Sequence, residues 1–144
     1  MFTASEFYNL WIFFLVWPLA IIGVLALMLS VALTEVERDE KGNSTEGGKY
    51  LIRCHISLMS ACGAYILVIL FAHLLVDPHQ YRFMFWNKYW VLFLALILTA
   101  DGLAILSTVQ GFRARGKGTW VLRIAMPIIS IVSILATLSF PHGD

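Results

Sequence analysis

The chain of 144 residues is 60% hydrophobic and only 13% charged. A soluble domain carries roughly a quarter charged residues, and a core of this size could not hide so much apolar surface. The formal net charge of +1 offers no basic excess of the kind that indicates binding to nucleic acid. The composition therefore excludes an ordinary soluble domain and favours a protein whose solvent is the lipid bilayer.

Four long apolar stretches divide the sequence, and each has the length of a membrane-spanning helix. Such a helix needs about 20 mainly apolar residues, and its backbone polar groups must be satisfied within the segment. A transmembrane β-barrel would show alternating polar and apolar residues, which these stretches lack. The sequence predicts a single all-α domain over residues 1–144, a four-helix transmembrane bundle with helices at about 7–33, 51–76, 89–110 and 119–140.

The segment between the second and third spans carries the signals of a short helix. Asp77 is a capping residue, Pro78 suits the first helical position and Gln80 the third. The run from Tyr81 to Trp86 that follows is mostly aromatic, and aromatic side chains collect at membrane–water interfaces. We therefore expect a short amphipathic helix to lie in the interface between these two spans.

The distribution of basic residues predicts the orientation of the chain. Loops 34–50 and 111–118, with Arg53 and Arg123 at the adjoining helix ends, hold eight of the ten Lys and Arg residues. Lys and Arg near span ends stay on the cytoplasmic side, so both loops are expected to face the cytoplasm or a matrix-like compartment. Both termini then face outward, in a bacterial inner membrane or an organelle membrane. The first loop also holds several glycines and is expected to be flexible and solvated.

The third loop is short, basic and rich in glycine, but it lacks the spacing of a phosphate-binding loop. Arg113, Arg115 and Lys117 lie in it, and Arg123 follows at the start of the fourth span. Basic residues at the cytoplasmic ends of spans are attracted to anionic lipids. These four side chains are therefore expected to contact lipid headgroups.

Asp101 lies near the middle of the third span and is the most informative residue of the sequence. An acidic residue there costs about 2.5–3.5 kcal/mol on insertion scales, so it should face the protein interior and have a partner. Counting about 1.5 Å per residue from the inner helix ends places Ser60 and Ser130 near its depth, with Tyr65 about a turn further out. The sequence predicts that these side chains and Asp101 form a small polar site inside the membrane.

Three interpretations of Asp101 remain open at this point. It can carry a proton or a cation, fix helix packing as a hydrogen-bonded carboxyl group, or pair with a basic residue of a partner subunit. The spans contain no basic residue at its depth, because Arg123 should lie nearly two turns closer to the inner side.

His55 and His73 form a second candidate site on one face of the second span. They are 18 residues apart, which is five helical turns or about 27 Å. This spacing would suit two haems, or a haem and a quinone, but bis-histidine ligation needs a second His and the other spans contain none. A haem held by this chain alone is not expected, whereas a haem or quinone shared with a partner subunit is an alternative to two interfacial polar residues. His79 and His142 lie outside the spans, and no metal site is expected from them.

No motif of soluble enzymes is present, such as a phosphate loop, HExxH or GxSxG, so an enzyme is not expected. The leading interpretation is a small non-catalytic, accessory subunit of a larger membrane complex, with a respiratory or electron-transfer assembly as the first host to examine. The first alternative is a self-sufficient, homo-oligomeric transporter or channel in which Asp101 is a proton or cation site. The second is a membrane anchor that contributes His55 or His73 to a haem or quinone site shared with a partner.

Overall fold

The described residues of the computed structural model, 12–75 and 82–139, form helices joined by two short loops at one end. In chain order the elements are the π-helical turn η1 (Ile12–Val16) and the helices α2 (Trp17–Leu33), α3 (Glu46–Leu75), α4 (Arg82–Arg113) and α5 (Trp120–Leu138). Four stretches within them are long and apolar enough to cross a membrane: Phe14–Leu33, Glu46–Ala72, Val91–Arg113 and Trp120–Leu138. The prediction of an all-α bundle with four helices long and apolar enough to span a membrane is confirmed for the described residues.

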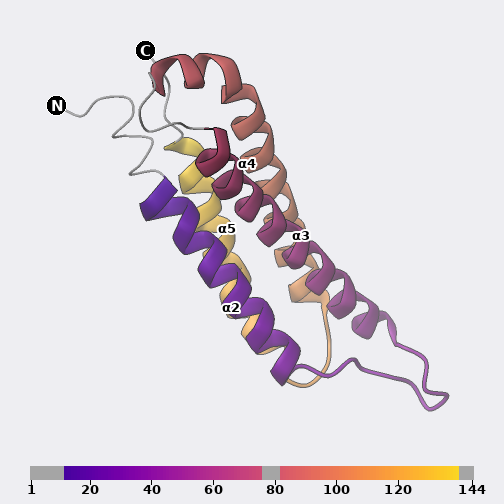
Figure 1. Cartoon of the computed structure of the whole chain (residues 1–144). Helices are drawn as coiled ribbons and strands as arrows, with labels where there is room; N and C mark the ends of the chain where they lie inside the picture. Colours follow the sequence, from indigo (N-terminus) through magenta and orange to yellow (C-terminus); the bar gives the residue numbers. More distant parts are fainter. Residues whose placement is uncertain (1–11, 76–81, 140–144) are drawn as a thin grey trace.

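The helices pack as a ring in which each contacts its neighbour in the sequence and α5 closes back onto α2 (Figure 1). The most extensive contact lies between α3 and α4. The loop from α2 to α3 and the loop from α4 to α5 lie at the same end of the bundle. This up-and-down arrangement is the bundle that short connections between long helices favour.

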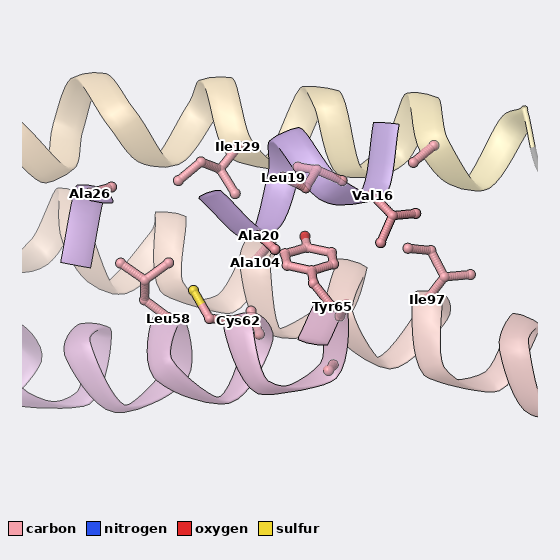
Figure 2. Packing of buried hydrophobic residues seen from close by; sticks show 14 of the residues in the cluster. Val16, Leu19, Ala20, Ala26, Leu58, Cys62, Tyr65, Ile97, Ala104 and Ile129 are labelled. Atoms are coloured by element: carbon pink, nitrogen blue, oxygen red, sulfur yellow. The ribbon is translucent and has the colours of Figure 1, made fainter. Parts of the chain in front are cut away.

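Large apolar side chains fill the axis of the bundle and also cover its outside. Val16, Leu19, Tyr65 and Ile97 are fully buried, and Figure 2 shows the Tyr65 ring reaching from α3 into the middle of this core. The outward faces are equally apolar, as illustrated by Leu25, which is 59% exposed. A helix that is hydrophobic on every face suits a lipid environment, because it has no polar face that could point toward water.

The first span begins with a widened turn. Pro18 has no backbone N–H, and its ring crowds the carbonyl group four residues earlier, at Phe14. The π-helical turn η1, Ile12–Val16, ends two residues before this proline and accommodates the interrupted hydrogen-bond ladder.

Helix α3 begins at Glu46, earlier than the predicted start at residue 51. Thr45 caps it, because its Oγ1 accepts a hydrogen bond of 3.2 Å from the backbone N–H of Gly48. A threonine that accepts from the third residue of a helix satisfies one of the N–H groups that have no partner within the helix. At the same end of the bundle, α4 runs on to Arg113, beyond the predicted end at residue 110.

The short interfacial helix predicted before the third span is not found as a separate element in the part of the chain that the structure describes. Residues 77–81 of that prediction lie outside the described residues, and from Arg82 onward the chain already belongs to α4. In Figure 1 the first turns of α4 run across the upper end of the bundle before the helix descends beside α3. Residues 82–86 of the aromatic run are therefore the first residues of α4.

The two loops at the other end of the bundle hold each other in place. The backbone N–H of Glu35 donates to the carbonyl of Lys117 (3.2 Å), and that of Arg115 donates to the carbonyl of Gly47 (3.3 Å). Glycine makes the approach feasible, since a Cβ on Gly116 would lie 2.5 Å from the Glu35 carbonyl oxygen. Gly116 thus serves the close packing of the two loops.

Candidate functional site

Asp101 lies on the face of α4 that packs against α5 and is only 9% exposed. Ser133 donates a hydrogen bond to its Oδ1 atom, and Thr137 donates one to its Oδ2 atom. Both donors come from successive turns of α5. The two carboxyl oxygens are therefore satisfied by hydroxyl groups of the same chain, which lowers the cost of placing a polar group among apolar helices.

Tyr65 extends this cluster to a third helix. Its hydroxyl group, on the fully buried side chain from α3, donates to the Oγ atom of Ser133 at 2.6 Å. Ser133 accepts from Tyr65 and donates to Asp101, so the three groups form a continuous hydrogen-bond chain across the bundle. We call Tyr65, Asp101, Ser133 and Thr137 the carboxyl cluster.

The described residues contain no basic side chain that pairs with Asp101. Arg123 precedes Ser133 on α5 by about 15 Å along the helix axis, and its guanidinium group donates to the carbonyl of Ala114 at 3.0 Å. That contact holds Arg123 at the loop end of the bundle. Within the described chain, the carboxyl cluster is a set of hydroxyl groups around one carboxyl group.

The structure places Ser60 and Ser130 away from Asp101. Ser60 is exposed on the outside of α3 and donates to the carbonyl of Ile56, on its own helix, at 2.9 Å. Ser130 lies closer to the loop end, where its hydroxyl is 2.7 Å from that of Thr108. The pair forms a second polar contact between α4 and α5. Of the hydroxyl groups expected near Asp101, only that of Tyr65 belongs to the carboxyl cluster.

Ser133 and Thr137 were not among the predicted partners of Asp101, and the helix ends explain why. The depth count assumed that the third span ended at residue 110, whereas α4 continues to Arg113. Moving the turn by three residues on one helix shifts the antiparallel partner by about one turn along the other. The available signal was the polar stripe of Ser130, Ser133 and Thr137 on a single face of α5, at the spacing of neighbours on a helix.

Polar contacts also join α3 to α4. Between α3 and α4, the Ser107 hydroxyl donates to the carbonyl of Cys54 (3.0 Å), and that of Ser57 donates to Oε1 of Gln110 (2.9 Å). Such contacts between helices contribute about 0.6 kcal/mol each on average in membrane proteins. Polar side chains inside the spans thus act mainly by connecting helices of this chain.

His55 joins α2 to α3, since its Nε2 atom is 2.6 Å from the hydroxyl oxygen of the fully buried Ser30. His73 belongs to α3, but its side chain, like His79 and His142, lies outside what the structure describes. Within the described residues, no group of three or more His, Cys, Asp or Glu side chains is arranged to hold a metal ion. A haem or quinone shared through His55 or His73 stays a prediction from the sequence.

The basic side chains expected at lipid headgroups gather at the loop end. Arg113, Arg115, Lys117 and Arg123 are all exposed. Arg113 lies over the ring of Tyr50, with its Cζ atom 5.7 Å from the ring centroid. Contact of these residues with lipid stays a prediction.

Comparison with protein-family models, curated proteins and solved structures gave no match for this chain. The class of protein is therefore given by the fold: four apolar helices, each able to span a bilayer, packed into one bundle.

Proposed function

We propose that this protein is a small, non-catalytic subunit of a larger membrane complex, in which its bundle serves as a scaffold. Two observations support the proposal. The first is that the polar groups of the spans, such as Asp101 and His55, have hydrogen-bond partners on neighbouring helices of the same chain. A carboxyl group surrounded in this way is arranged to fix helix packing.

The observation that carries the proposal is a face of small side chains on the outside of α4. Ala95, Thr99 and Gly102 are all exposed and follow one another at helical spacing along one side. A Cβ placed on Gly102 would meet no atom within 4 Å, so this face is unfilled by the chain itself. Small residues let the backbones of two membrane helices approach closely, and a partner helix is their ordinary use.

The proposal is tested by purifying the tagged protein from its native membrane in mild detergent. We expect unrelated membrane proteins to co-purify in fixed stoichiometry. Gly102→Leu should release them, because a leucine side chain blocks close approach, whereas Leu25→Phe, on the outer face of α2, should retain them. Unchanged thermal stability of the Gly102→Leu variant would show that its own bundle is intact. Recovery of the wild type as a pure homo-oligomer or a monomer would contradict the proposal.

A second candidate function, transport of protons or cations, is favoured by one specific feature. The chain from Tyr65 through Ser133 to Asp101 links hydroxyl groups to an exchangeable carboxyl group inside the membrane. Hydrogen-bonded side chains of this kind can relay protons, and intramembrane acidic residues often mark ion pathways.

Proteoliposomes that contain a pH-sensitive dye distinguish this candidate from the scaffold. If the chain transports protons, the wild type dissipates an imposed pH gradient and Asp101→Asn does not, because an amide cannot exchange an acid proton. Asp39→Asn, in the exposed loop, is the matched control with the same change in charge. Equal leakage through all three proteins and empty vesicles would exclude transport by the isolated chain.

We also propose that the loop end of the bundle faces the cytoplasm or matrix and that the first turns of α4 lie in the opposite interface. The co-location of both basic loops at one end supports the orientation. The course of α4 across the upper end supports the interfacial placement. Spin labels at residues 83 and 85 that report full exposure to water would contradict the second statement.

A further inference from the structure

Two guanidinium groups from different helices meet on one aromatic ring at the loop end. The Cζ atom of Arg53 lies 5.6 Å from the ring centroid of Tyr50, and that of Arg113 lies 5.7 Å from it. Nη1 of Arg113 also donates to the Tyr50 hydroxyl at 3.4 Å. Contacts of this kind attract a cation to the face of a ring, so both positive charges are held against the same phenol ring, with their Cζ atoms no more than about 11 Å apart.

The charges of this pair are not neutralised within the described part of the chain. Arg53 and Arg113 are both exposed, and no described carboxylate forms an ion pair with either. Each guanidinium group has five N–H donors, and the bond to Tyr50 uses one of those on Arg113. Two like charges that contact one ring, with most of their donors open, form a site that favours an anion.

A third donor stands beside them on α4. Gln110 accepts a hydrogen bond from Ser57 through Oε1, and no described acceptor contacts its amide nitrogen. Gln110 precedes Arg113 by three residues, which places the two side chains on the same face of α4. An amide donor and two guanidinium groups therefore border the junction of α3 and α4.

The position of the site along the bundle indicates the class of its ligand. Arg113 is the last residue of a span, and Arg53 lies in the second turn of α3, beside the loops. The end of a span lies at the level of lipid headgroups, where the phosphates are. Guanidinium groups match phosphate oxygens with paired, charge-assisted hydrogen bonds.

We propose that Arg53 and Arg113, held together by Tyr50, bind the phosphate of an anionic phospholipid headgroup at the inner surface of the membrane. The aromatic ring sets the spacing of the two arginines, and Gln110 adds a neutral donor. This site differs from general attraction of a basic loop to lipid, since it depends on an uncharged residue as well as on charge. It is independent of whether the bundle serves as a scaffold or a transporter.

The test uses nanodiscs made from equal parts of phosphatidylcholine and phosphatidylglycerol, and native mass spectrometry counts the lipids that stay with the released protein. The wild type should retain phosphatidylglycerol in preference to phosphatidylcholine. Arg53→Gln and Arg113→Gln should each reduce that preference about fivefold, since one basic side chain near an anionic surface contributes about 1 kcal/mol. Arg38→Gln is the matched control, because that guanidinium group contacts the Gly42 carbonyl within the first loop.

Tyr50→Leu provides the decisive variant, because it removes the ring and leaves every charge in place. We expect it to lower the preference for phosphatidylglycerol, while inorganic phosphate added in excess leaves the lipid bound. An unchanged preference in Tyr50→Leu, or an equal loss in Arg38→Gln, would reduce the effect to non-specific charge and overturn the site. Displacement of the lipid by inorganic phosphate would assign the site to a soluble phosphate instead.

Discussion

Gly23 of α2 faces Cys62 of α3 so closely that a Cβ atom on Gly23 would lie 2.7 Å from the cysteine Sγ atom. Farther along the same two helices, Ser30 meets His55 in the same antiparallel register. Glycine thus fixes the distance between the helices, and the polar pair fixes their alignment. Close approach at a small residue is how membrane helices gain van der Waals contact.

Gly23→Ala is therefore expected to destabilise the bundle. The added methyl group must displace the buried Cys62 side chain, and overpacking of this kind costs about 1–3 kcal/mol of the free energy of unfolding. The measurement is unfolding in mixed detergent micelles, followed by circular dichroism. Gly63→Ala is the control, since its Cβ would meet no atom within 4 Å.

The double variant Gly23→Ala with Cys62→Ala checks the cause. If the clash with sulfur is responsible, the second substitution should recover part of the lost stability, so that the two changes together cost less than their sum. Equal stability of Gly23→Ala and Gly63→Ala would show that α2 and α3 are not packed at this distance.

Ser133→Ala should cost more than any other loss of a single hydroxyl group in the spans. It leaves both the Tyr65 hydroxyl and Oδ1 of Asp101 without their described partner, and a buried polar group without a partner costs about 1–3 kcal/mol. Ser60→Ala removes the same atom from an exposed position and should be nearly neutral. Thermal unfolding of the two variants in one detergent compares them directly. Similar melting temperatures would show that the carboxyl cluster does not stabilise the bundle.

The four spans could be predicted because lipid imposes a length of apolar sequence that few other structures require. The helix ends could not, since α3 and α4 continue past the apolar residues into polar ones that are held by a capping threonine and by the neighbouring loop. Hydropathy measures where lipid can surround a helix. Hydrogen bonds decide where the helix stops.

The same limit governs the candidate site. The position of Asp101 in a span was enough to predict that it faces the interior, because an ionised or unpaired carboxyl group in hydrocarbon is costly. Its partners depended on the register between α4 and α5, which the position of the turn sets. The polar stripe marked the face of α5, and the end of α4 at Arg113 selects Ser133 and Thr137 within it.

Gly118→Ala should loosen the junction between the two loops. Gly118 has φ = +80°, a conformation that costs other residues roughly 1–2 kcal/mol, and a Cβ there would collide with the carbonyl oxygen of Leu33. Gly42→Ala is a matched control, because Gly42 has φ = +83° and an open environment. Only the collision separates the variants, so limited proteolysis should cut the loops of Gly118→Ala faster. Equal rates of cleavage would mean that α2 and the third loop are not in contact.

The orientation of the bundle predicts which sites a membrane-impermeant thiol reagent reaches. The natural cysteines, Cys54 and Cys62, are buried and give little background labelling. In intact cells or organelles, Ala4→Cys should be labelled from outside, whereas Ser44→Cys should be labelled only after the membrane is permeabilised. The reason is that eight of the ten Lys and Arg residues lie in or beside the two loops of one end, and basic residues are retained on the cytoplasmic side.

Both loops lie together at that end, so one accessible position in either of them would reverse the orientation of the whole bundle. Labelling of Ser44→Cys before permeabilisation would therefore place the arginine pair on Tyr50 at the outer surface and require its phospholipid there.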